Sequence, residues 1–544
     1  MATASDSDAV VPVSGNEEAL AEPNGAENSA PNSGVSSDSP DAPQDEKSPA
    51  PPPILETDEE AEPSEDIAIL SVDEELSAND AADPTQISVS RSGRDEEGNG
   101  TADDPYATLN KAFEEAAATA TVYVMDDLTL ESEVTAAGSI AKGISARNIT
   151  LRKAPGVSGS VDIARYKNIL DSDENYIGYM FTVSAGSTLT IEGITINGNS
   201  VAGSNAAVAV YGSFTMKDST IENNKVSGMG GGVYVMGAAA RFDMQDGVIT
   251  GNTATLGGSG VYLHSGAMNI SGDVRIGDSD DDNGVYLTSN VRINIAGTLG
   301  SSARVNVEKH QNARVGTQIA TKAGGGLTAA DVGKFFWQTI AYKIVAGSGE
   351  SADSCVLAVN ETDFYIAGKG NDNTGKGSVD KPFATLTRAF EELPRGAGVK
   401  CTVHVKSDVS EQAIATLSEG DVTVKTWENA TKKPASIVRG DFNEYIIQVR
   451  GGAKLTLDNL IIDGGEVTNC LSALGIEGGS EVVMQDVEIT RNYTQVYGGG
   501  VTLVGGSKLT VGDGSVILGN SAPERKGGAI YVFDDGKSQP PELT

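Results

Sequence analysis

The chain is poor in cysteine, histidine and aromatic residues. Among its 544 residues it has three cysteines, three histidines and two tryptophans, and aromatic residues make up only 5%. Cys355, Cys401 and Cys470 are odd in number and widely spaced, so they match neither a disulfide framework nor a Cys-x-x-Cys metal site. We interpret them as small, buried apolar residues.

Long apolar segments are missing as well. No stretch approaches the length needed to cross a bilayer, so we expect no membrane insertion in this segment. The first residues, Met1–Asp6, also lack the basic region and apolar core of a secretory signal. The protein is then either intracellular or a mature segment without its leader. We favour the second interpretation and expect a leader and an anchor to lie outside the given sequence.

Basic residues are scarce relative to acidic ones. The chain holds 39 Lys and Arg against 76 Asp and Glu, a formal net charge of −37. Nucleic acids and anionic membranes require cationic surfaces, so neither is expected as a partner. Residues 1–84 contain 22 of the acids and one base, Lys47. Such a segment buries too little apolar surface to fold, which predicts a disordered acidic spacer over 1–84.

Glycine is abundant, with 65 residues, and it follows a repeated phrase. The phrase reads Met-x-Asp-x-x-Ile-x-x-Asn, and a Gly-rich turn and a short β pattern come after it. Three copies are clear and a fourth is blurred: Met216–Asn224, Met244–Asn252, Met484–Asn492 and Val511–Asn520. The first two copies lie 28 residues apart. A fixed period of this length is typical of a solenoid, in which each repeat stacks on its neighbour.

A longer phrase occurs twice and divides the chain. Pro105–Ala116 and Pro382–Leu393 are nearly the same, and both have apolar residues at helical spacing. Thr108 is the expected N-cap of the first helix. We expect each helix to cover the open end of a β-helix, where unpaired strand edges invite aggregation. This predicts two tandem β-helix domains, over residues 85–359 and 360–544, with the second continuing beyond Thr544.

Short alternating strands broken by Gly, Asn and Asp complete the pattern, as in Gly186–Gly198 and Gly452–Gly464. The pattern resembles the right-handed parallel β-helix of the pectate-lyase-like superfold over roughly residues 85–535. Its Gly-Gly phrases and Ile-x-x-Asn motifs are similar to the repeats of bacterial surface and autotransporter-type β-helices. The resemblance implies an all-β solenoid that is secreted or displayed at a cell surface.

The polar residues of the repeat are interpreted as structural. The asparagines that end each phrase favour a ladder of stacked amides over a set of ligands: Asn224, Asn252, Asn492 and Asn520. The aspartates within the phrase favour turn chemistry over an active site: Asp218, Asp246 and Asp486.

One acidic loop has the spacing of a cation site. Asp278, Asp280 and Asp282 alternate, which suits a calcium ion. The glycine expected directly after the third acid is replaced by Asn283, and no bidentate glutamate follows, so a solvated acidic loop is the competing interpretation. Calcium is the only cofactor that the sequence suggests.

Arg439, Gly440 and Asp441 form the tripeptide that integrins read. An adhesive role requires an exposed loop tip, and chance supplies this tripeptide readily in a chain rich in Gly and Asp. An inert copy is therefore the competing interpretation.

No catalytic residue is assigned from the sequence. The histidines, His264, His310 and His404, have no Ser or Cys partner at a recognised spacing. The Asn-Thr-Asp, Asp-Asp, His-Gly and Arg-Ile-Lys set of pectin-type hydrolases is incomplete. We therefore expect a non-catalytic bacterial surface protein, a monomer that binds an extracellular glycan or a surface protein. A polysaccharide lyase or glycoside hydrolase with an unrecognised site is the alternative.

Overall fold

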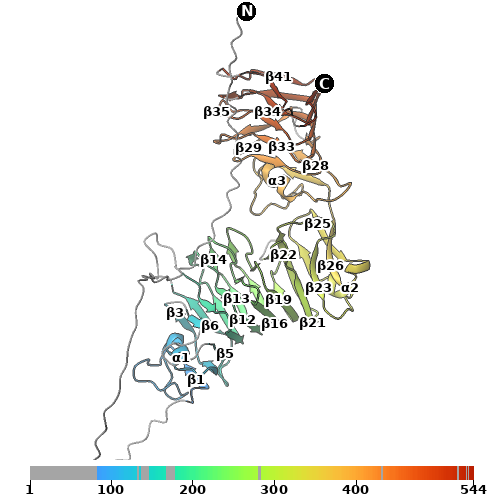
Figure 1. Ribbon diagram of the computed structural model, residues 1–544. Helices are drawn as coiled ribbons and strands as arrows, with labels where there is room; N and C mark the ends of the chain where they lie inside the picture. The colour runs from blue at the N-terminus through green and yellow to red at the C-terminus, as the bar shows by residue number, and fades with distance from the viewer. Residues whose placement is uncertain are drawn as a thin grey trace, which may run out of the picture. The chain divides into compact units, whose positions relative to one another are not determined.

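The chain forms an all-β parallel solenoid of about 14 turns (Figure 1). This is a computed structural model, and it describes residues 83–131, 134–136, 146–166, 178–279, 284–429, 433–495, 497–523, 526–534, 536 and 538–544. Residues 77–544 belong to one compact unit. The predicted acidic spacer lies almost entirely outside the described residues.

The first large sheet has 23 strands, and a separate three-stranded ribbon runs beside it. The strands of the large sheet are β1 (Gln86–Val89), β2 (Thr119–Val124), β3 (Leu128–Leu130), β4 (Val134–Ala136), β5 (Asn148–Lys153), β6 (Val161–Arg165), β7 (Phe181–Val183), β8 (Thr188–Glu192), β9 (Ile194–Asn197), β11 (Val208–Val210), β12 (Ser213–Lys217), β13 (Thr220–Glu222), β15 (Val233–Val235), β16 (Arg241–Thr250), β18 (Val261–Leu263), β19 (Ala267–Ile276), β20 (Val285–Leu287), β21 (Ile293–Leu299), β22 (Arg304–His310), β23 (Gln318–Lys322), β24 (Phe335–Trp337), β25 (Tyr342–Ala346) and β26 (Ser354–Val359). The ribbon consists of β10 (Ala202–Gly203), β14 (Lys225–Val226) and β17 (Thr253–Ala254).

The later strands form sheets of ten, five and two strands. The ten-stranded sheet contains β27 (Asp363–Ile366), β28 (Lys400–Val405), β29 (Val409–Glu411), β31 (Asp421–Thr426), β32 (Ala435–Arg439), β34 (Lys454–Asp463), β37 (Glu481–Thr490), β40 (Lys508–Val511), β41 (Val516–Leu518) and β43 (Glu542–Leu543). The other two contain β30 (Ala415–Leu417), β33 (Ile447–Val449), β36 (Leu474–Ile476), β39 (Val501–Val504) and β42 (Ile530–Phe533), and β35 (Thr468–Cys470) with β38 (Tyr493–Thr494).

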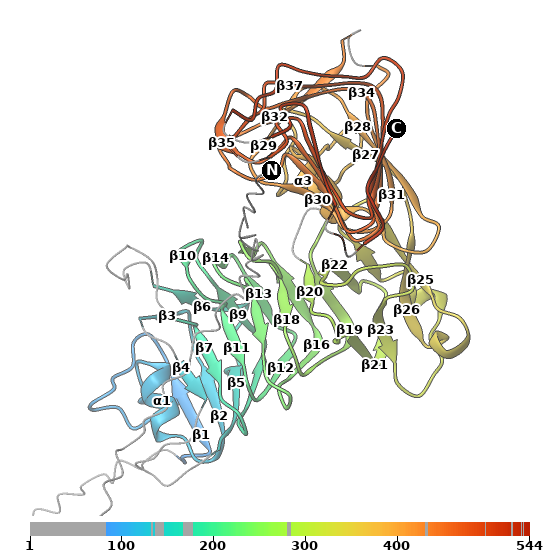
Figure 2. The same ribbon diagram turned by 45° about the horizontal axis from the view of Figure 1, so that its top comes forward.

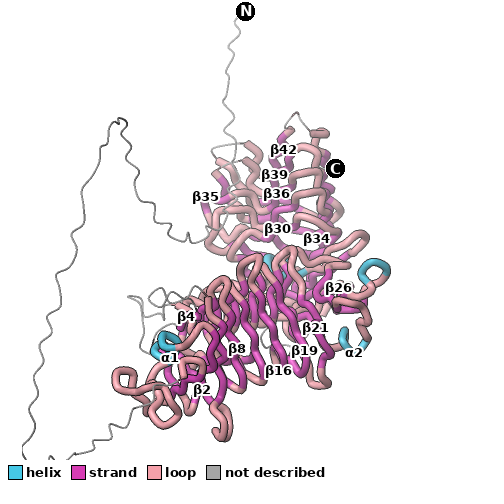
Figure 3. The backbone as a smooth tube through the Cα atoms, turned by 60° about the horizontal axis from the view of Figure 1, so that its bottom comes forward, coloured by secondary structure: helices cyan, strands magenta, loops and turns pink. Residues whose placement is uncertain are grey.

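Strands of successive coils pair in parallel and in register. Figure 3 shows β8, β16 and β19 in the row of strands along one face of the solenoid. Met216 pairs with Met244, which confirms the 28-residue period for this coil. The period is not constant, however. Val261 pairs with Val285, 24 residues on, and Asp421 pairs with Lys454, 33 residues on. The coils differ in the length of their loops, while their strands stay aligned.

Every second side chain of a strand points into the solenoid, as the alternating pattern predicts. On one inner face Leu189, Phe214, Phe242 and Met268 pair from coil to coil, and all are fully buried. The rings of Phe214 and Phe242 stack with centroids 5.3 Å apart. The core is therefore a set of columns in which apolar side chains of successive coils stack on one another.

The repeated aspartates form corners, which confirms their interpretation as turn residues. Asp218, Asp246 and Asp486 have φ values of 43°, 69° and 52°. Aspartate tolerates this left-handed conformation better than most residues, because its short side chain can hydrogen-bond locally. The chain therefore bends there and begins the next face of the coil.

Both predicted helices are present, but they are shorter than predicted. Helix α1 covers Leu109–Glu115 and helix α3 covers Leu386–Glu392. Thr108 caps α1 through a hydrogen bond from the Lys111 amide, as expected. The residues just before each cap are extended, since Tyr106 bridges Val89 and Phe383 bridges Ile366. A third helix, α2, covers Ala329–Val332.

Within the described strands, the parallel pattern is interrupted at β26. Strand β26 pairs antiparallel with β23 and β25, and β27 then starts a sheet of its own. Among the described residues, no strand up to β26 pairs with a strand from β27 onward.

In Figure 2 the coils that carry β30, β34 and β37 lie over one another. No helix of the described chain is long and apolar enough to span a bilayer.

Candidate functional site

Three tyrosines form a column on the outer face of the first large sheet. Tyr234, Tyr262 and Tyr286 are the middle residues of β15, β18 and β20, and they pair with one another in register. Ring centroids are 5.8 Å apart for Tyr234 and Tyr262, and 4.6 Å apart for Tyr262 and Tyr286. We call these three residues the tyrosine column.

The column follows from the strand pattern. Each tyrosine stands between two fully buried aliphatic residues, so its side chain points outward. On the preceding coil, Ala209 pairs with Tyr234. On the following coil, Lys309 pairs with Tyr286. The ring of His264 lies beside the column, with centroids 6.5 Å from Tyr234 and 6.4 Å from Tyr262. The aromatic surface is therefore bounded by a small residue at one end and a cation at the other.

A glycine-rich loop packs against one side of the column. The Glu308 carboxylate holds this loop by accepting hydrogen bonds from the amides of Gly258 and Ser259, at 3.1 and 2.8 Å. Gly257 has a φ of 99°, and a Cβ there would lie 2.8 Å from Cδ2 of Tyr286. Glycine is required because a side chain would clash with the ring. The loop leaves Leu256 exposed beside the aromatic rings.

The column is chemically neutral. Burial raises the pKa of Tyr262 to about 12, and the neighbouring tyrosines add to this effect. Burial also raises the pKa of Tyr286. Both phenols therefore keep their protons at neutral pH. The faces of Tyr262 and Tyr286 cover each other, so the column presents ring edges and hydroxyl groups, which suit a ligand with both apolar and polar edges, such as a sugar ring.

A cavity of about 190 Å³ opens where the column ends. Its lining includes Lys309 and His310 of β22, Trp337 of β24, Tyr342 of β25, and Glu392 and Arg395 at the end of α3. The cavity thus brings together residues that are more than 80 positions apart in the sequence. It combines aromatic rings with both signs of charge.

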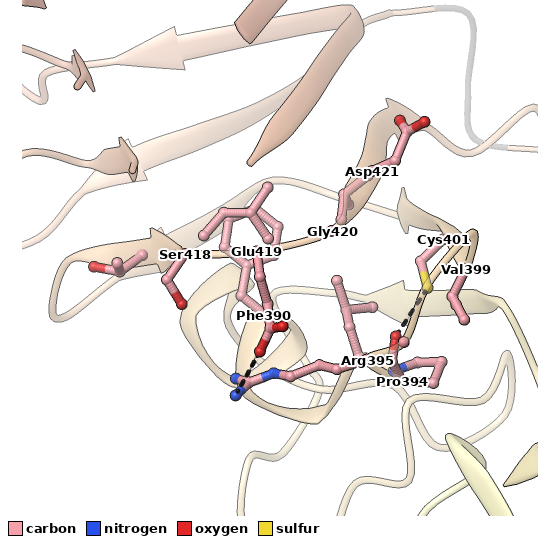
Figure 4. Close-up of a pocket in the computed structure, with 14 residues that line it drawn as sticks. Phe390, Pro394, Arg395, Val399, Cys401, Ser418, Glu419, Gly420 and Asp421 are labelled. Atoms are coloured by element: carbon pink, nitrogen blue, oxygen red, sulfur yellow. Dashed lines mark hydrogen bonds and ion pairs between the residues drawn. The ribbon is translucent and has the colours of Figure 1, made fainter. Parts of the chain in front are cut away.

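A second hollow, on the other side of Arg395, is too small for a ligand. It offers about 50 Å³ and is lined by Phe390, Cys401 and Glu419 among others (Figure 4). Arg395 Nη1 lies 3.6 Å from Oε1 of Glu419, and the Cys401 thiol faces the carbonyl of Pro394. Pockets for drug-sized ligands measure about 300–1,000 Å³, so this space suits a few waters at most.

The Arg439-Gly440-Asp441 tripeptide is not presented at a loop tip. Arg439 is only 3% exposed, and its Nη2 donates to the carbonyls of Leu471 and Ser472 at 2.9 and 3.1 Å. Burial lowers the pKa of its guanidinium. Asp441 is exposed, but the arginine that an integrin would read is held inside the solenoid.

The acidic loop can be followed only at its first residue. Asp278 forms an ion pair with Arg275 and accepts a hydrogen bond from Oγ1 of Thr250 at 3.0 Å. Asp280 and Asp282 lie outside the described residues. Within the described part of the chain, no group of three His, Cys, Asp or Glu residues is arranged to hold a metal ion.

The repeated asparagines form the predicted ladder. Nδ2 of Asn224 donates to Oδ1 of Asn252 at 2.9 Å, and Asn492 donates to Asn520 in the same way. At the end of each ladder, the preceding coil carries a glycine. At Gly198, for example, a Cβ would lie 2.5 Å from Oδ1 of Asn224, so no side chain fits there. These asparagines bind the backbone of their own solenoid.

The three histidines have structural neighbours. Nε2 of His404 lies 2.8 Å from Oδ1 of Asp363, and the ring stacks on Tyr365. His310 is buried and accepts a hydrogen bond from the Asn312 amide on Nδ1. The cysteines are buried as predicted, and burial raises the pKa of Cys355 to about 12 and of Cys401 to about 11.

Neither the tyrosine column nor the cavity was assigned from the sequence. The signal for the column was visible, since the Val-Tyr-Val and Val-Tyr-Leu triplets follow the glycine turns of successive repeats. The cavity has no local signal, because its residues come from separate strands and a helix. Comparisons of the chain with protein-family models, with curated proteins and with solved structures found no match.

Proposed function

We propose that the chain is a bacterial surface protein that binds an extracellular glycan along its outer face, without catalysing a reaction. The tyrosine column is the observation that carries this proposal. Its three rings stand in a row on the outer face of the sheet, with Tyr262 7% exposed between its two neighbours, and the ring of His264 lies beside them. A glycan chain lying across the coils would contact the outward edges and hydroxyl groups of these rings on successive coils.

We also propose that the chain is organised as two domains. Residues 85–359 and 360–544 are two right-handed β-helices in tandem, each opened by a capping helix. The break in strand pairing between β26 and β27 supports this division. Helix α1 packs against β1 and β4, and α3 packs against β27 and β30, at the first coil of each stretch. The protein is a monomer that is secreted or attached to the cell surface and extends its binding face outward.

Removing two rings of the column should weaken glycan binding. In the double variant Tyr234→Ala/Tyr286→Ala we expect the dissociation constant for the best-retained neutral oligosaccharide to rise about tenfold or more, because aromatic anchors dominate such contacts. Binding is measured by affinity electrophoresis and calorimetry with cello-, xylo- and malto-oligosaccharides.

The matched control is Tyr123→Ala, which removes an outward tyrosine from strand β2, away from the column. It should leave binding unchanged. If the double variant keeps its fold, as judged by circular dichroism, and still binds like the wild type, the column is not the binding surface.

A further inference from the structure

The tyrosine column leads directly into the cavity. Tyr286 of β20 pairs with Lys309 of β22, so the lysine occupies the next position of the column. Lys309 also lines the cavity, together with His310 and Trp337. The end of a glycan bound along the column would therefore reach the cavity.

Two aromatic residues give the cavity a rigid wall. Trp337 and Tyr342 meet edge to face, with centroids 5.3 Å apart. Nε1 of Trp337 donates to Oγ1 of Thr339 at 3.1 Å, and the Tyr342 hydroxyl donates to the Ala313 carbonyl at 3.1 Å. Because their polar atoms are already engaged, these side chains offer apolar surface to a ligand.

His310 adds a hydrogen-bond donor. Its Nδ1 accepts the Asn312 amide at 3.1 Å, which places the proton of the neutral ring on Nε2. Burial lowers the pKa of His310, so the ring stays neutral at neutral pH. A neutral donor of this kind suits a hydroxyl group of a sugar.

The carboxylates around the cavity have partners, although Glu391 and Glu392 share one cation, Arg388. Glu392 is 6% exposed and pairs with Nη1 of Arg388 at 2.9 Å, and Glu391 pairs with the same atom at 3.3 Å. Arg395 lies 3.6 Å from Glu419, and the Glu308 carboxylate accepts the two loop amides beside Tyr286.

The ammonium of Lys309, in contrast, has no ion pair within the described residues. It is half-buried in a chain whose net charge is −37. A half-buried cation without a partner, in a strongly acidic protein, attracts an anionic group of a ligand.

We infer that the cavity binds one terminal sugar ring that carries a carboxylate, with Trp337 against the ring and Lys309 against the carboxylate. A volume of about 190 Å³ is below the range of about 300–1,000 Å³ typical of drug-sized ligands, which fits a single ring. The acidic surface disfavours a glycan with an acid on every residue, so one terminal acid is the expected pattern. This inference rests on the proposed glycan binding and names its ligand.

The chain offers its own reporter for a test. Trp337 and Trp427 are its two tryptophans, so Trp427→Phe leaves Trp337 as the only one. This variant is titrated with glucuronate, N-acetylneuraminate and glucose while Trp337 fluorescence is recorded. We expect saturable changes with an acidic sugar and a dissociation constant about fivefold or more below that for glucose.

Lys309→Gln in the same background should abolish the preference for the acidic sugar. Lys343→Gln, which neutralises an exposed lysine of β25, should not. Equal responses to acidic sugars and glucose, or a preference that survives Lys309→Gln, would overturn the inference. Oligosaccharide retention by the tyrosine column is measured separately, so the inference can fail while the proposed function stands. If the column retains no oligosaccharide, the proposed function fails.

Discussion

Replacing Asn252 by alanine should destabilise the solenoid by about 3–5 kcal/mol, because it leaves several buried polar groups without partners at about 1–3 kcal/mol each. Oδ1 of Asn252 accepts the backbone amide and the side-chain amide of Asn224, at 3.0 and 2.9 Å. Its Nδ2 donates to the carbonyls of Ile221 and Thr250, both at 3.0 Å. One side chain thus joins two coils.

Two measurements check this result. Urea unfolding followed by circular dichroism gives the loss in free energy of unfolding. Hydrogen exchange should show faster exchange for the coils around Asn252, since each coil of a solenoid is stabilised mainly by its neighbours. The control is Asn148→Ala, an exposed position at the start of β5, which should change stability by less than about 0.5 kcal/mol. Equal effects of the two substitutions would contradict the ladder.

Replacing Glu411 by alanine should cost about 2–4 kcal/mol, because two backbone amides and one hydroxyl lose their acceptor in a buried site. Glu411 is fully buried. Its carboxylate accepts the Leu386 amide at 2.6 Å, the Thr387 amide at 3.1 Å and the Thr387 hydroxyl at 2.8 Å. These are the first amides of α3, so the substitution should loosen this helix. The measurement is urea unfolding.

The control for Glu411→Ala is Glu428→Ala. The side chain of Glu428 is 83% exposed, and its ion pair with Lys425 spans 3.4 Å, so its removal should have almost no effect. A stability loss at Glu428 as large as that at Glu411 would argue against the helix-capping role of Glu411.

The contribution of Glu411 should depend on pH in a defined direction. Burial raises the pKa of Glu411 above 4.5, although the hydrogen bonds it accepts partly offset the rise. The folded state then holds a proton where the unfolded state has lost it, so this stabilisation is present at low pH and lost as pH rises through the folded pKa. The stability of the wild type relative to Glu411→Gln should therefore fall as the pH rises above about 4.5. A rise over this range would contradict the assignment.

The repeats allowed much of the fold to be predicted. The phrase that ends in Asn224 and Asn252 predicted the stacking, because identical residues one coil apart must meet in a parallel solenoid. Thr108 could be predicted as the N-cap of a helix, because capping depends only on a local hydrogen bond to its side chain. Variation in coil length was missed, because loops change length without disturbing the strand register.

The candidate site was harder to predict. Tyr234, Tyr262 and Tyr286 are ordinary strand residues in sequence, and only the register shows that their rings stack. The cavity depends on β22 meeting the end of α3, a contact between distant segments that no local pattern encodes. The integrin-type tripeptide shows the reverse case, since its local sequence suggested a site while the fold buries Arg439.

The most direct test of the proposed function is to incubate the purified chain with a polysaccharide panel and to measure retention and product release together. We expect that at least one glycan is retained, that the double variant Tyr234→Ala/Tyr286→Ala loses this retention, and that no sugar is released. Release of unsaturated or reducing sugars by the wild-type chain would contradict it and would identify a carbohydrate-active enzyme.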